Sequence, residues 1–146
     1  MTKRHVGRLL AAIGVGAGLA FAIPVLPAVG QVSPPAVLSV EVGDEATLVA
    51  RGAAVLVPVE VTCPAGSSAS LSVRVTQRAG SRIASGSRFT SDFVCTGATQ
   101  VVEVLVHAQG QAFKKGPAVA EASLFACLDF FFCQGVSDTE NIEIAR

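Results

Sequence analysis

The sequence predicts an exported all-β protein, a two-layer antiparallel β-sandwich of seven to eight strands that follows a secretion signal. Valine-rich runs recur at regular spacing over residues 37–145, and Gly, Ser and Pro separate them. Short runs of β-branched residues divided by turn residues are typical of sandwich strands. The first 30 residues combine a basic start with an apolar stretch, which predicts export.

Composition allows one folded domain and argues against a nucleic-acid partner. The chain has 146 residues, of which 51% are hydrophobic and 15% charged, so it can bury a core. Beyond residue 30 there are eight basic and eleven acidic side chains, an excess of three negative charges. A mildly acidic domain is poorly suited to bind phosphate backbones.

The chain divides into a signal peptide over 1–30, an extended lead-in over 31–36 and a domain over 37–146. Lys3, Arg4 and Arg8 precede an apolar run, and Ala28-Val29-Gly30 predicts cleavage before Gln31. The alternative is an uncleaved membrane anchor, because the apolar run is nearly long enough to span a bilayer. Such an anchor would be the only expected contact with a membrane.

Strands are expected in the following ranges: 37–42, 46–50, 54–63, 69–78, two short edge strands around Ile83 and Phe89, then 99–108, 118–127 and 139–145. Period-two alternation indicates half-buried strands. The residues expected to face inward are Val55, Val57, Val59 and Val61, Leu71, Val73 and Val75, Val102, Val104, Val106 and Ala108, alternate residues of Ala118–Ala126, and Ile142 and Ile144. Pro58 indicates an edge or a bulge. For 118–127 a helix is the alternative, because alanine favours helices.

Four cysteines in a small exported chain predict two disulfides. Cys127 and Cys133 are expected to close across a hairpin end, which leaves Cys63 to pair with Cys95. Zinc is not expected, because Cys127-x5-Cys133 is the only close pair and His107 is the only histidine beyond the signal. No other metal or cofactor is expected.

The order of the expected strands over most of residues 37–145 resembles an immunoglobulin-like domain. Small secreted actinobacterial proteins with an immunoglobulin-like sandwich and no assigned function are similar in three segments: Val61-Thr62-Cys63-Pro64-Ala65-Gly66, Cys95-Thr96-Gly97, and Ala112–Gly116 leading into Ala118–Ala122. Cys133–Asp138, after a short loop between cysteines, looks similar to neocarzinostatin-type apoproteins. The immunoglobulin-like topology implies that all four cysteines lie at one end of the domain, and it leaves Cys63–Cys127 open as an alternative bridge.

The candidate binding loop lies between the last two cysteines and contains Leu128, Asp129, Phe130, Phe131 and Phe132. Three consecutive phenylalanines cannot all point inward from a short loop, so an exposed apolar cluster is expected. The alternative is that the loop caps the core. Glu103 with His107 is expected to be a solvated surface pair and not a catalytic one. The arginines 74, 78, 82 and 88 form a candidate basic stripe.

These features predict a non-enzymatic binding or structural module that acts at or outside the cell envelope. Its partner would be a protein or an envelope component, recognised by the disulfide-stapled loop end. The alternative is a carrier of a small apolar ligand, as the likeness to neocarzinostatin-type apoproteins implies. A carrier would need a cleft of roughly 300 Å³ or more.

Overall fold

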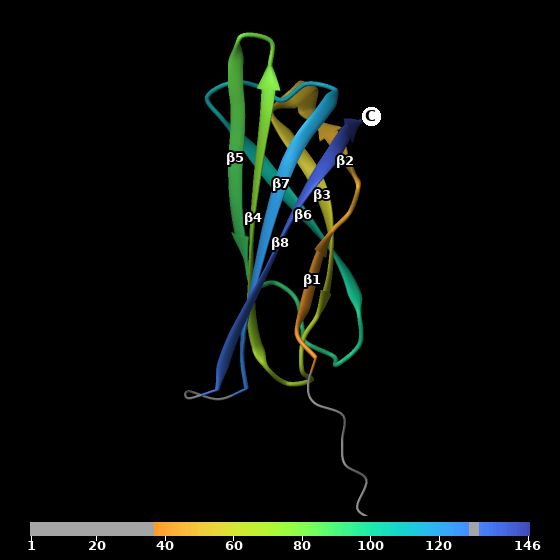
Figure 1. Ribbon diagram of the computed structural model, residues 1–146, viewed down its shortest axis with the longest axis vertical. Coiled ribbons are helices and arrows are strands. Elements are labelled where there is room, and N and C mark those ends of the chain that lie inside the picture. Colours follow the sequence, from red (N-terminus) through yellow and green to blue (C-terminus); the bar gives the residue numbers. More distant parts are fainter. Residues whose placement is uncertain (1–36, 129–131) are drawn as a thin grey trace, which may run out of the picture. The chain divides into compact units, whose positions relative to one another are not determined.

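The computed structural model describes residues 37–128 and 132–146 of the chain, and these residues form an all-β domain (Figure 1). The strands are β1 (Ser39–Val42), β2 (Glu45–Val49), β3 (Ala54–Thr62), β4 (Ser68–Ala79), β5 (Arg82–Thr90), β6 (Gln100–Gln109), β7 (Gly116–Cys127) and β8 (Cys133–Ala145), with one short 3-10 helix η1 (Ala50–Gly52). The expected signal peptide and lead-in lie outside the described residues. Within them, no helix is long and apolar enough to cross a membrane.

The prediction of an open, two-sheet immunoglobulin-like sandwich is wrong, because the sheet closes into a seven-stranded barrel. The strands follow one another around the barrel in the order β3, β2, β8, β7, β4, β5, β6, and β6 returns to β3. Two joins connect what would be the free edges of a sandwich. β2 runs parallel to β8, and β5 meets β6 at Ser85↔Gln109 and Gly86↔Ala108. β1 pairs with β3 beyond the end of β2.

Gly86 makes the second join possible. A Cβ atom at this position would lie 2.2 Å from the carbonyl oxygen of His107, so only glycine lets β5 approach β6 this closely. In the sequence Gly86 stands in a stretch rich in Gly, Ser and Arg, and nothing in that stretch indicates a contact with β6. The expected pair of short strands around Ile83 and Phe89 is in fact the continuous strand β5.

The core follows the predicted alternation closely. The inward-facing residues of β3, β4, β7 and the end of β8 are buried, and Val104 and Val106 of β6 are buried with them. Residues 118–127 belong to a strand, so the helical alternative is wrong. β8 begins at Cys133, six residues before the expected start, and it pairs with β7 from Cys133 to Ile144.

Pro58 lies inside β3, at neither an edge nor a bulge. β3 pairs with β1 over residues 59–62 and with β2 over residues 54–56, so Pro58 falls where the neighbouring strand changes. The backbone N–H of Gly43, between β1 and β2, donates to the carbonyl of Pro58 at 2.9 Å. Proline has no N–H to donate. Because neither β1 nor β2 pairs with β3 at Pro58, no ladder hydrogen bond from this position is lost.

The loop between β6 and β7 closes one end of the barrel with Phe113, whose side chain is buried in the core. The N–H of Phe113 donates to the carbonyl of Gly52 at 2.9 Å. The buried side chain of Gln77 donates from Nε2 to the carbonyl of Lys114 at 2.7 Å and accepts from the N–H of Lys114 at 2.8 Å. This loop lies at the upper end of the domain in Figure 1.

Candidate functional site

Two disulfides connect the four cysteines in the pairing that the spacing favours. Cys63 is bonded to Cys95 with their Cα atoms 5.2 Å apart, and Cys127 is bonded to Cys133 with their Cα atoms 4.0 Å apart. The expectation of two disulfides is therefore confirmed, and the alternative bridge from Cys63 to Cys127 is not present.

Both disulfides lie at one end of the barrel, opposite Phe113, although the immunoglobulin-like topology from which a shared end was expected is not the one observed. Cys63 directly follows β3, and the second disulfide joins the end of β7 to the start of β8. Cys63 and Cys95 pack against Ala126, the residue before Cys127. We call this the pinned end; it comprises residues 63–68, 91–99, 125–128 and 132–133. It is the lower end in Figure 1.

The loop over residues 91–99 connects β5 to β6 and is tied to the end of β3. The N–H of Gly97 donates to the carbonyl of Cys63, and the N–H of Gly66 donates to the carbonyl of Cys95, both at 3.1 Å. β3 pairs with β6 along the edge that faces away from β5. The disulfide and these hydrogen bonds therefore draw the loop to the far side of β6, and they prevent β5 and β6 from closing into a tight hairpin.

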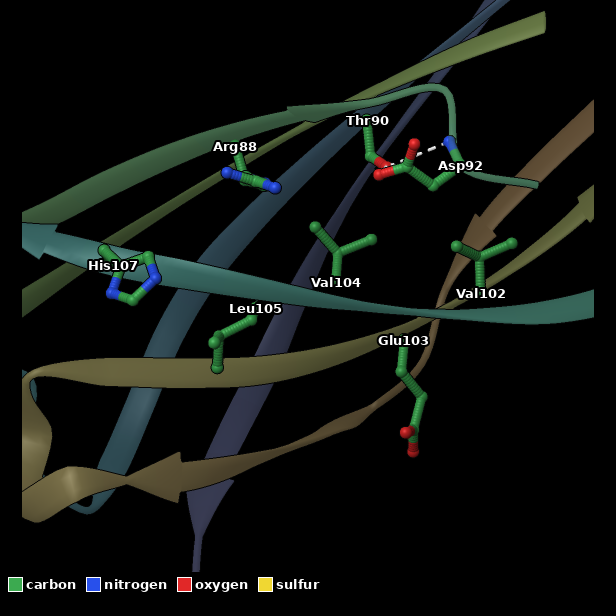
Figure 2. Close-up of a pocket in the computed structure, with 8 residues that line it drawn as sticks. All are labelled: Arg88, Thr90, Asp92, Val102, Glu103, Val104, Leu105 and His107. Carbon is green, nitrogen blue, oxygen red and sulfur yellow. Dashed lines mark hydrogen bonds between the residues drawn. The ribbon is translucent and has the colours of Figure 1, made fainter.

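A groove separates β5 from β6 below their short join. It encloses about 280 Å³. Arg88, Thr90 and Asp92 line it on one side, and Val102, Val104 and Leu105 line it on the other. Figure 2 shows Val102 and Val104 pointing from β6 toward β5, with Glu103 pointing away. The groove narrows toward Gly86 and opens toward the loop of residues 91–99.

The structure does not bring the other candidate polar residues together. Glu103 and His107 both border the groove, but they are exposed and lie four residues apart on β6, which separates their Cα atoms by about 13 Å at the usual rise of a strand. Arg74 and Arg78 share the outer face of β4, whereas Arg88 lines the groove. The expected basic stripe is therefore divided between two surfaces.

The described part of the candidate binding loop is exposed. Leu128 is 57% exposed and Phe132 is 70% exposed, and the N–H of Leu128 donates to the carbonyl of Phe132 at 3.0 Å. The remaining residues of the candidate loop, Asp129, Phe130 and Phe131, lie outside the described residues.

Three further apolar side chains are exposed at or beside the pinned end: Val37, Val94 and Phe125. Sequence reasoning did not select them. The alternation of β7 is the signal that could have found Phe125, because its even-numbered residues face inward. For Val37 and Val94, which lie outside the strands, no comparable periodic signal exists.

A hollow near the second disulfide bears on the carrier hypothesis. It encloses about 310 Å³ on the outer face of β7 and β8, where Phe125, Gly135 and Val136 line it together with Ser123 and Ser137. Sites for small ligands usually bury most of the ligand's surface. This hollow is open to solvent and partly polar, so it offers an apolar ligand little enclosure.

The described residues form a small β-barrel. The side chain of Phe113 fills one end, and two disulfides pin the other end. Comparisons with models of protein families, with curated proteins and with solved structures found no match. The suspected relationship to small secreted actinobacterial proteins therefore stays a prediction, and the immunoglobulin-like sandwich that it implied is not the fold of this domain.

Proposed function

We propose that the chain is an extracellular, non-enzymatic binding module that contacts a protein or an envelope component through its pinned end. The gathering of exposed apolar side chains at this end is the observation that supports the proposal. Phe125 lies near the end of β7, Leu128 directly follows β7 and Phe132 directly precedes β8, and each is at least half exposed. Single exposed apolar residues are ordinary, but a group of them often marks an interaction surface.

The disulfides support both the compartment and the mode of binding. Stable disulfides are typical of proteins that leave the cytoplasm. Pinned loops also lose less conformational freedom when they bind, so more of the contact energy contributes to affinity. Cys63–Cys95 and Cys127–Cys133 hold segments of the pinned end from two sides of the barrel.

Serine substitutions at the pinned end test the proposal. We expect the variant Phe125→Ser/Leu128→Ser/Phe132→Ser to bind its partner about thirtyfold more weakly or worse, because buried aromatic anchors contribute about 2 kcal/mol or more at interfaces. The partner is captured from culture fluid and envelope fractions with the oxidised protein and identified by mass spectrometry. Its affinity is then measured by biolayer interferometry.

The matched control is Ile83→Ser/Val119→Ser, which removes exposed apolar side chains on β5 and β7 away from the pinned end. This variant should bind with unchanged affinity. Equal affinities for the wild type and the pinned-end variant, with circular dichroism showing both folded, would count against the proposal.

A further inference from the structure

Strand β6 has one paired edge and one open edge. On one side it pairs with β3 through eight consecutive residue pairs, from Gln100↔Val61 to His107↔Ala54. On the other side it meets β5 only at Ala108 and Gln109. Within residues 37–128 and 132–146, no strand pairs with Val101–Leu105 on the side of the groove.

The hydrogen bonds show which backbone groups face the groove. The N–H of Ala108 donates to the carbonyl of Ala53 at 2.8 Å, so the even-numbered residues of β6 direct their backbone groups toward β3. In an antiparallel ladder, successive residues direct these groups to opposite sides. Val101, Glu103 and Leu105 therefore direct their N–H and C=O groups into the groove. The carbonyl of His107 follows the same alternation, since it points at Gly86 of β5.

An open edge of this kind is unusual in a stable protein. Natural edge strands are commonly short, bulged, or protected by lysine or proline, because an unpaired edge is a template for another strand. Residues 101–107 of β6 contain neither lysine nor proline; five of the seven are valine or leucine, and the other two are Glu103 and His107. The edge is also held open, because Cys95 ties the loop of residues 91–99 to the end of β3.

We propose that this groove binds an extended segment of a partner polypeptide, which adds to β6 as a further strand. The open edge presents alternating donors and acceptors, and the backbone of another extended chain complements that pattern. One face of the added strand would contact Val102 and Val104 on the β6 wall of the groove, which favours apolar side chains at alternate positions. The same face would also meet Arg88 and Thr90 on the β5 wall. Its other face would lie beside Glu103, which favours basic or hydroxyl side chains.

This site is distinct from the surface in the proposed function. The groove is lined by residues of β5, β6 and the start of the following loop, and Phe125, Leu128 and Phe132 are not among them. The binding measurement with the serine variant and the hydrogen-exchange experiment described below can therefore give negative results independently of each other.

Hydrogen exchange of the wild-type protein tests the added strand. The oxidised, ¹⁵N-labelled protein is mixed with the synthetic peptide acetyl-Thr-Val-Lys-Val-Thr-Val-Lys-amide, and amide exchange is followed by NMR. We expect saturating peptide to slow exchange at Val101, Glu103 and Leu105 by tenfold or more. Exchange at Val102, Val104 and Val106 should stay nearly unchanged, because β3 already protects these amides.

Two N-methylated peptides provide the matched controls. Residues paired by hydrogen bonds carry their side chains on the same face, so the Thr and Lys residues of the peptide should direct their N–H groups to β6. Methylation of those nitrogens should abolish protection, and methylation of the Val nitrogens should preserve it. Unchanged exchange at Val101, Glu103 and Leu105 with the unmodified peptide would overturn the proposal. Protection of these amides that rises with protein concentration alone would also overturn it, in favour of a second copy of the chain.

Discussion

The variant Phe113→Ala is expected to lose about 3–5 kcal/mol of unfolding free energy, the usual cost of truncating a buried phenylalanine. Phe113 is 2% exposed and fills the end of the core opposite the disulfides. Its loop is held by hydrogen bonds to Gly52 and Gln77, so the surrounding backbone has little freedom to collapse into the space left behind. Because small domains are stable by only about 5–15 kcal/mol, this loss is severe. Urea denaturation monitored by circular dichroism measures it.

Phe89→Ala is the matched control, because the same side chain is 64% exposed on β5. We expect it to change the free energy of unfolding by less than about 1 kcal/mol. Equal losses for the two variants would show that Phe113 does not fill the core as described.

The variant Cys63→Ala/Cys95→Ala is expected to lose about 3–4 kcal/mol of unfolding free energy. In the chain-entropy account, a disulfide stabilises by restricting the unfolded chain, and the effect grows with the length of the closed loop. This bridge closes a sequence separation of 32 residues. Alanine is the appropriate replacement, because both sulfur atoms belong to buried residues and a serine hydroxyl would be left without water there.

The second disulfide supplies the comparison. Cys127–Cys133 closes a separation of only 6 residues, so Cys127→Ala/Cys133→Ala should cost about 2 kcal/mol. Denaturant titrations of both variants under identical conditions show which variant loses more unfolding free energy. A larger loss from the shorter loop would contradict the account of how these bridges stabilise the domain.

Strand positions and their buried faces could be predicted because each depends on local alternation. The valines of β3 and the alanines of β7 repeat with a period of two, and the structure buries the members expected to face inward. The disulfide pairing could also be predicted. The short separation of Cys127 and Cys133 favours a bond between them, which leaves Cys95 as the partner of Cys63.

Closure of the barrel could not be predicted, because it depends on contacts between segments that are distant in sequence. The parallel join of β2 to β8 brings Glu45 beside Glu143, and the join of β5 to β6 depends on a glycine next to a carbonyl. Neither contact leaves a periodic pattern. The groove escaped prediction for the same reason, since it exists only because those two strands meet at one point and then separate.

Peptide mapping of the unreduced protein tests most directly whether two separate disulfides pin one end of the barrel. Trypsin would release residues 52–74 with Cys63, residues 89–114 with Cys95, and residues 116–146 with both remaining cysteines. We expect mass spectrometry to find the first two peptides linked to each other and the third linked to neither. A peptide pair joining residues 52–74 to residues 116–146, or free thiols at these cysteines, would contradict the account.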